Sequence, residues 1–153
     1  MPNFNIMNYF IFIFSLVISV AAFWFSVKFI RLYFKVRKWN RVDASVLLKE
    51  IILNPKSSSA RSPYGLKVVY AFKFNNKEYQ GSNVYLVELA GGQANHMKST
   101  AESKLNKIED TMSIFVNPND ASQSVMYCEG LGLYVLVFFM GILSLLIGLS
   151  KIL

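Results

Sequence analysis

The sequence predicts an α+β membrane protein in which two transmembrane helices flank a small, mainly antiparallel β domain that carries one short helix. Two observations lead to this class. Residues 1–27 and 131–150 contain no charged side chain, whereas the segment between them alternates polar and apolar residues as a half-buried sheet does. We therefore expect a first transmembrane helix with a basic cytoplasmic extension over residues 1–41, a β-rich soluble domain over 42–127 and a second transmembrane helix over 128–153.

Both apolar blocks are long enough to cross a bilayer as helices. Tyr9–Val27 has 19 residues, which at about 1.5 Å per residue covers a hydrocarbon layer of roughly 30 Å, and Leu131–Ser150 is of similar length. Two core helices of a soluble protein are disfavoured because the rest of the chain is too small to surround them. A cleaved signal peptide is the rival interpretation of the first block, since Val20–Ala22 resembles a cleavage site. Signal peptides normally carry a basic residue before the apolar run, however, and no basic residue precedes the run here.

The positive charge is concentrated beside the first block. The net charge is +7, and six positive residues come before the first acidic residue, Asp43. They are Lys28, Arg31, Lys35, Arg37, Lys38 and Arg41. The positive-inside rule therefore places residues 28–130 in the cytoplasm and both termini outside. The sequence has no Asn-x-Ser/Thr sequon, which fits the membrane that we expect, a bacterial inner (cytoplasmic) membrane.

This basic segment is expected to continue the first helix beyond the membrane and to contact anionic lipid headgroups. Its charges alternate at helical spacing with an apolar face made of Phe29, Leu32, Val36 and Trp39. Each basic residue near an anionic surface contributes about 1 kcal/mol. Nucleic-acid binding is the competing interpretation of a basic, aromatic-rich segment, but the segment directly adjoins a span, so no nucleic-acid partner is expected.

Both spans carry a strip of small residues at spacings of three and four. The strips are Ser15, Ser19, Ala22 and Ser26 on the first span and Gly141, Ser144 and Gly148 on the second. Such strips let helix backbones approach closely, either within the chain or against a second copy in a homo-oligomer. Chance spacing of common membrane residues is the alternative.

The first half of the central domain reads as three strands. Val42–Leu53 alternates until Ile51–Leu53, where we expect burial on both faces. After a serine-rich loop over Pro55–Pro63, Gly65–Phe74 is the clearest strand. Asn75-Asn76 fits a two-residue hairpin turn, and the return strand is expected over Lys77–Val87, with Gly81 at a bulge or a close approach.

The second half predicts one helix and two short strands. Ser99 and Glu102 have the spacing of a capping box ahead of a helix over residues 101–110. A strand over Met112–Val116 ends in the turn Asn117–Asp120, and Ser124–Tyr127 is the last strand. We expect a small antiparallel sheet that curls toward a barrel.

This order of elements resembles that of a known bacterial membrane family. The segments that carry the resemblance are Trp39–Val46, Tyr70–Phe74, Lys77–Gly81, Ile114–Asp120 and Ser124–Val125, together with the flanking spans. They resemble the family called domain of unknown function 3592. Because no general activity comes with that family, the resemblance implies architecture only.

No pattern in the sequence predicts a catalytic, cofactor or metal site. His96 and Cys128 are the only residues of their types, and although such a pair can act as base and nucleophile, no motif surrounds either. We expect His96 in a solvated loop and Cys128 buried near the membrane interface, with lipidation as an alternative. One histidine and one cysteine do not make the usual zinc set, so the expected protein is not an enzyme.

The leading hypothesis is therefore a membrane-anchored interaction or accessory protein. Its expected partners are membrane lipids and another protein, which binds a sheet edge or the side chains of Tyr70, Tyr79 and Tyr85. Simple core packing is the competing explanation of these tyrosines. The alternative function is an immunity-type protein that neutralises a membrane-acting toxin through its spans or its β domain.

Overall fold

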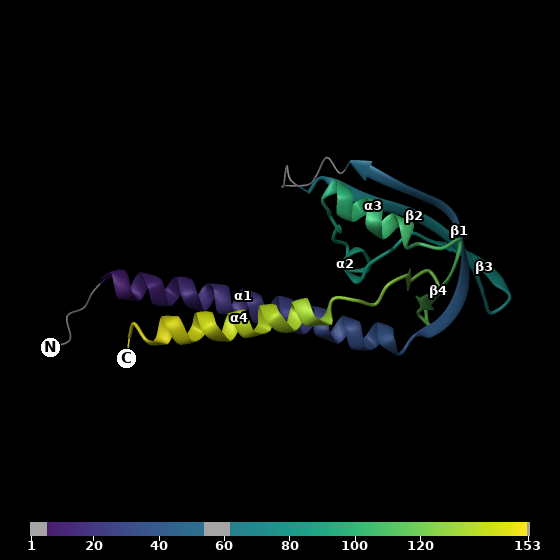
Figure 1. Cartoon of the computed structure of the whole chain (residues 1–153). Coiled ribbons are helices and arrows are strands. Elements are labelled where there is room, and N and C mark those ends of the chain that lie inside the picture. The colour runs from purple at the N-terminus through teal and green to yellow at the C-terminus, as the bar shows by residue number, and fades with distance from the viewer. Residues whose placement is uncertain (1–5, 54–61, 153) are drawn as a thin grey trace. The chain divides into compact units, whose positions relative to one another are not determined.

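A computed structural model describes residues 6–53 and 62–152 of the chain (Figure 1). Most of the loop expected over Pro55–Pro63 lies outside these residues. The chain divides into two compact units, which we describe separately. The helical unit comprises residues 1–34 and 130–153, and the β unit comprises residues 35–129.

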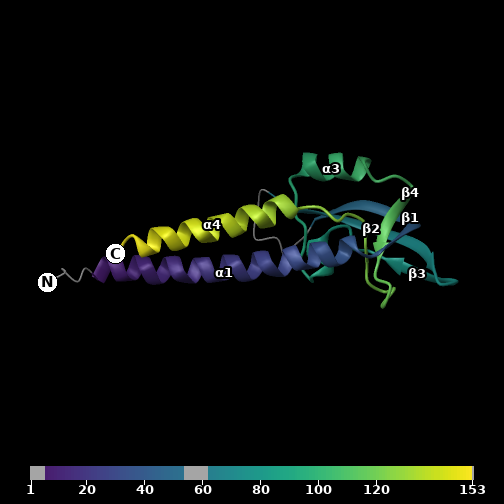
Figure 2. The same cartoon turned by 90° about the horizontal axis from the view of Figure 1, so that it is seen from below.

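The helical unit consists of two long apolar helices, α1 (Ile6–Arg37) and α4 (Leu131–Leu149). They lie side by side in both Figure 1 and Figure 2. Each is long and apolar enough to cross a membrane. Only 17% of the most apolar 18-residue stretch of each helix is buried, whereas the core helix of a soluble protein is mostly buried. The predicted pair of terminal candidate spans is therefore present, and α1 continues through the basic segment as expected.

The β unit is built on one five-stranded antiparallel sheet in the order β3-β2-β1-β4-β5. Its strands are β1 (Asn40–Leu53), β2 (Tyr64–Phe74), β3 (Lys77–Gly81), β4 (Thr111–Val116) and β5 (Ser124–Val125). Two helices, α2 (Leu86–Leu89) and α3 (Lys98–Asn106), lie between β3 and β4 in sequence. The predicted α+β class is confirmed.

The hairpin between β2 and β3 forms at the predicted turn. Asn75 and Asn76 adopt φ values of +51° and +61°, which the two central residues of a type I′ turn require and which asparagine tolerates. Gly81 ends the hairpin at a close approach, because a Cβ there would lie 2.5 Å from the Tyr70 ring. Both features agree with the expectation from the sequence.

The sheet curls until its two edges meet through the segment that follows β3. The backbone N–H of Met126 donates to Asn83 O at 3.1 Å, and that of Tyr127 donates to Val84 O at 2.9 Å. Tyr85 and Tyr127 form a further bridge. The predicted tendency toward a barrel is therefore present, and it depends on a connection that the strand pattern alone did not indicate.

One face of the sheet and the inner face of α3 enclose the core of the β unit. The side chains of Val68, Tyr70 and Ile114 are fully buried, and Ala101 of α3 is buried against them. α3 contacts both β1 and β2. The apolar alternation along β2 therefore points into this core, as its sequence predicts.

A bulge in β1 corrects the expectation that Ile51–Leu53 is buried on both faces. The register between β1 and β2 shifts between Val46 and Leu48. Before the shift Ala44 points into the core, and after it Ile51 does so. Because one extra residue reverses the face of every later side chain, Ile52 lies on the face opposite Ile51 and is 38% exposed instead of buried. Leu53, the last residue of the strand, is 69% exposed.

The return strand is shorter than the predicted Lys77–Val87. β3 ends at Gly81, and residues Leu86–Leu89 form a helical turn because the Glu88 carboxylate accepts hydrogen bonds from the backbone N–H of Val84 (2.6 Å) and Tyr85 (3.2 Å).

The predicted capping box is wrong. α3 begins at Lys98, ends at Asn106 and has Met97 as its N-cap, with no side-chain cap bond. Ser99 lies inside the helix because the Ala101 N–H already donates to Met97 O at 2.9 Å.

Candidate functional site

The first feature of the β unit is the second half of β1. β1 pairs with β2 from Ala44 to Leu53, but with β4 only from Asn40 to Ser45. In the described part of the chain, Leu47–Leu53 therefore has no strand neighbour on the side away from β2. We call this segment the free half of β1.

Apolar side chains project from the free half of β1. Four of its residues are exposed large hydrophobics, namely Leu47 (58%), Leu48 (40%), Ile52 (38%) and Leu53 (69%). Edge strands are usually kept short or charged because an open edge invites pairing with another chain. A long apolar edge is instead the surface on which an extended segment of a partner adds as a strand. In the sequence, the consecutive residues Leu47-Leu48 interrupt the alternation of β1. This pair is the one local indication of the exposed surface, and the strand pattern as a whole did not predict that surface.

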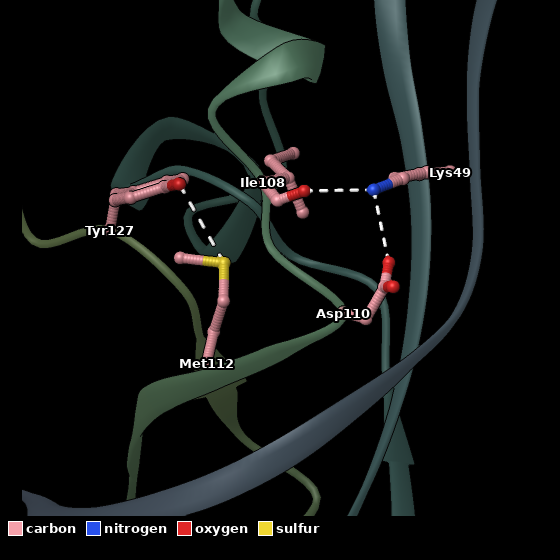
Figure 3. A network of polar contacts seen from close by, with 5 residues as sticks. All are labelled: Lys49, Ile108, Asp110, Met112 and Tyr127. Carbon is pink, nitrogen blue, oxygen red and sulfur yellow. Dashed lines mark hydrogen bonds and ion pairs between the residues drawn. The ribbon is translucent and has the colours of Figure 1, made fainter.

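Polar contacts involve Lys49 and Glu50 of the free half of β1, and those of Lys49 are drawn in Figure 3. The Lys49 ammonium donates to Ile108 O at 2.9 Å and lies 3.1 Å from the Asp110 carboxylate. On the other side of the strand, Glu50 pairs with Lys67 of β2 at 2.8 Å. Both ion pairs are exposed and contribute little stability.

A second feature is an open hollow of about 480 Å³, which we call the tyrosine pocket. Its lining residues are Tyr85, Lys104, Lys107, Glu109, Thr111, Met112, Ser113, Tyr127 and Glu129. The rings of Tyr85 and Tyr127 stack with centroids 5.9 Å apart, and the Lys104 ammonium lies 4.5 Å from the Tyr85 centroid. Figure 3 shows the Tyr127 hydroxyl above the Met112 sulfur, to which it donates at 3.7 Å.

The two tyrosines of the tyrosine pocket have raised pKa values. Burial raises the pKa of Tyr85, and the neighbouring Tyr127 and Glu88 raise it further. Burial also raises the pKa of Tyr127. Both hydroxyls are therefore neutral near pH 7 and can donate or accept hydrogen bonds, but neither acts as a base.

Burial shifts the pKa values of both His96 and Cys128. The His96 ring packs edge-on against Tyr85 at 5.7 Å, and burial followed by the charge of Lys104 lowers the pKa of the imidazole. Burial raises the pKa of the Cys128 thiol, which reduces the thiolate that a nucleophile needs. Among the described residues, no group of three or more His, Cys, Asp or Glu could hold a metal ion.

The three tyrosines proposed as partner contacts occupy different environments. Tyr70 is fully buried in the core. Tyr79 is half-buried and stacks on Phe72 with centroids 5.7 Å apart. Of the three, Tyr85 lines the tyrosine pocket, whereas core packing accounts for Tyr70 and Tyr79.

The basic residues all lie on exposed positions. Lys28 and Arg31 belong to the helical unit, and Lys35, Arg37, Lys38 and Arg41 belong to the β unit. The opposite face of this segment is covered, since Phe29, Val36 and Trp39 are buried. The charged and apolar faces therefore separate as the helical spacing predicts.

The small-residue strips meet between α1 and α4 within the helical unit. A Cβ at Gly148 would lie 2.8 Å from the Ser15 Cβ, and one at Gly141 would lie 3.1 Å from the Ala22 Cβ. The Ser144 hydroxyl donates to Ser15 O at 3.2 Å. The remaining two members, Ser19 and Ser26, are buried on α1.

Searches of protein-family models, of curated proteins and of solved structures find no match to this chain. The resemblance to domain of unknown function 3592 therefore stays a prediction.

Proposed function

We propose that this chain is a non-enzymatic membrane-anchored interaction or accessory protein. Its two apolar helices hold the β unit at the cytoplasmic face of a bacterial inner membrane, with both termini outside. Its partner is an extended segment of another protein. The observation that carries this proposal is the free half of β1, an ordered strand whose open edge bears four exposed apolar side chains.

The free half of β1 offers both kinds of contact that an added strand makes. Backbone groups of the free half supply main-chain hydrogen bonds, and side chains such as Leu47 and Leu53 supply apolar anchors. The bulge between Val46 and Leu48 leaves the consecutive residues Leu47 and Leu48 both exposed. A partner strand that covers them removes apolar surface from water, which contributes about 25 cal/mol for each Å² buried.

The membrane placement is supported by the composition of α1 and α4 and by their mutual packing. A first helix retained in the mature chain explains why α1 presents small residues to α4, since Ser15 and Ala22 face Gly148 and Gly141. The six basic residues after the first span favour a cytoplasmic β unit.

A labelling experiment tests the side of the membrane. Glu78 is exposed on β3, so Glu78→Cys on a Cys128→Ser background provides one accessible thiol. A membrane-impermeant maleimide is added to intact and to lysed cells. Labelling only after lysis is expected. Labelling of intact cells would place the β unit outside and overturn the proposed topology.

Site-specific photo-crosslinking tests the partner surface. A photoreactive amino acid at Leu53 is expected to give one discrete protein adduct in cells, whereas the same probe at exposed Lys73 of β2 gives none. Adding Leu47→Lys to the Leu53 probe should abolish the adduct by charging the edge. Ser45→Lys, which adds the same charge to the paired half of β1, should leave it. Equal adducts from all four proteins would refute strand addition.

The alternative, an immunity-type protein, is less well supported. Its version through the spans requires the small-residue strips as the toxin-binding surface, but Ser15, Ala22, Gly141 and Gly148 already contact one another within the helical unit. Its version through the β unit uses the same free half of β1, and the identity of the crosslinked adduct distinguishes a toxin from another partner.

A further inference from the structure

We propose that α1 carries a binding site for one anionic phospholipid at the end of its apolar segment. Lys28 and Arg31 hold the phosphate of the headgroup, and Trp24 separates this headgroup site from an apolar track for an acyl chain. The proposal rests on the membrane placement of α1 but not on the partner proposed for β1.

The headgroup site is a hollow of about 540 Å³ on the surface of α1, lined by Phe23, Trp24, Val27, Lys28 and Arg31. Residues 24, 28 and 31 are separated by four and three positions, so they share one helix face. The Lys28 ammonium lies 5.5 Å from the centre of the Trp24 ring. This contact holds the ammonium at the rim of the hollow, because a cation is attracted to the face of an aromatic ring.

An apolar track begins at the same tryptophan. A second hollow of about 500 Å³ is lined by Leu16, Val17, Val20, Ala21 and Trp24. Trp24 is thus common to both hollows and is 68% exposed. From Leu16 to Trp24 the helix advances about 12 Å, which leads an acyl chain from the headgroup site toward the interior of the bilayer.

Charge complementarity selects an anionic lipid. The sequence contains no Asp or Glu side chain before Asp43, so no carboxylate on this segment competes for Lys28 or Arg31. A zwitterionic headgroup brings its own ammonium, which these two cations repel, whereas an anionic headgroup offers its phosphate alone. Arginine binds phosphate through a planar fork of N–H groups, and lysine adds a point charge.

Fluorescence quenching by brominated lipids tests the site directly. The chain has two tryptophans, so Trp39→Phe leaves Trp24 as the only emitter. The purified full chain is reconstituted in vesicles that contain brominated phosphatidylglycerol or brominated phosphatidylcholine, each mixed with the unbrominated form of the other lipid. We expect Trp24 to report a roughly fivefold preference for phosphatidylglycerol, which corresponds to about 1 kcal/mol.

Matched variants decide whether the preference belongs to this site. Lys28→Gln/Arg31→Gln should reduce it to about onefold, because the phosphate loses both cations. Lys35→Gln/Lys38→Gln, which removes two exposed charges of the same segment outside the hollow, should retain it. Equal quenching by the two lipids, or equal losses in both double variants, would overturn the site. Quenching by neither lipid would show that α1 is outside the bilayer and would overturn the membrane placement as well.

Discussion

The hydroxyl of Tyr70 on β2 lies 3.0 Å from the hydroxyl of Ser124 on β5, although β1 and β4 separate these strands in the sheet. Both side chains are fully buried. The Tyr70 hydroxyl also lies 3.2 Å from Asn83 O, and the Asn83 amide donates to Ser124 O at 3.0 Å. This small polar network therefore joins β2 to the edge strand β5 inside the core.

Removing the Tyr70 hydroxyl should weaken this junction. Tyr70→Phe keeps the ring but leaves the buried Ser124 hydroxyl without its partner, so the free energy of unfolding should fall by about 1–2 kcal/mol. Chemical denaturation of the purified full chain, followed by tryptophan emission, measures the change. Tyr79→Phe is the control, because its ring stacking on Phe72 is unaffected. An equal loss in both variants would show that the network contributes nothing specific.

The same tyrosine should make the fold sensitive to alkali. Burial raises the pKa of Tyr70 from 10.0 to about 12. Because the unfolded chain ionises first, this contribution to stability is complete below about pH 10 and is lost as the pH rises to about 12. The unfolding free energy should fall over this interval, with a smaller slope in Tyr70→Phe. Some slope remains in that variant, since the pKa of Tyr85 is also raised. A flat profile in the parent protein would contradict the prediction.

A methyl group at Gly81 should not fit. Its Cβ would lie 2.5 Å and 2.6 Å from two atoms of the Tyr70 ring and would also meet the Ser124 hydroxyl. Gly81→Ala should therefore lower the unfolding free energy by about 2 kcal/mol or more, as overpacking of a core does. At Gly65 the nearest atom to a new Cβ is 3.6 Å away, so Gly65→Ala should be tolerated. Thermal unfolding of the two variants side by side tests this difference.

Cysteine crosslinking should show that the two apolar helices pack within one chain. On a Cys128→Ser background, Ala22→Cys/Gly141→Cys places two thiols where the Cβ positions are 3.1 Å apart. Mild oxidation should give an intrachain disulfide, seen as a faster monomer band on a non-reducing gel. Ala21→Cys/Gly141→Cys is the control, because Ala21 is exposed on another face of α1. A dimer band from the Ala22 pair would instead indicate packing between copies.

The sequence was most informative where one residue type satisfies one local requirement. Asn75 and Asn76 predicted a turn with positive φ, and the uninterrupted apolar blocks predicted α1 and α4. It was least informative where a tertiary interaction reverses a local pattern. The bulge after Val46 depends on pairing with β2, so the local sequence pattern assigned Ile52 to the wrong environment.

The proposed lipid site and the tyrosine pocket were predictable only in part, because each depends on contacts that the local sequence does not show. The charges of Lys28 and Arg31 are visible in the sequence, but their association with Trp24 in one hollow requires the helix geometry. Tyr85 was selected from its strand pattern, yet its stacking partner Tyr127 comes from the far end of the domain. Contacts between residues that distant in sequence leave no local signal.

The hydrogen bonds that Met126 and Tyr127 make to the segment after β3 also impose an order on biosynthesis. Strands β1 to β3 are contiguous in the chain, so they can pair as soon as they leave the ribosome. The bonds that close the sheet must wait for Tyr127, and only three residues separate Tyr127 from Leu131, where α4 begins. Closure of the sheet and the emergence of the second apolar helix therefore occur at nearly the same moment of translation.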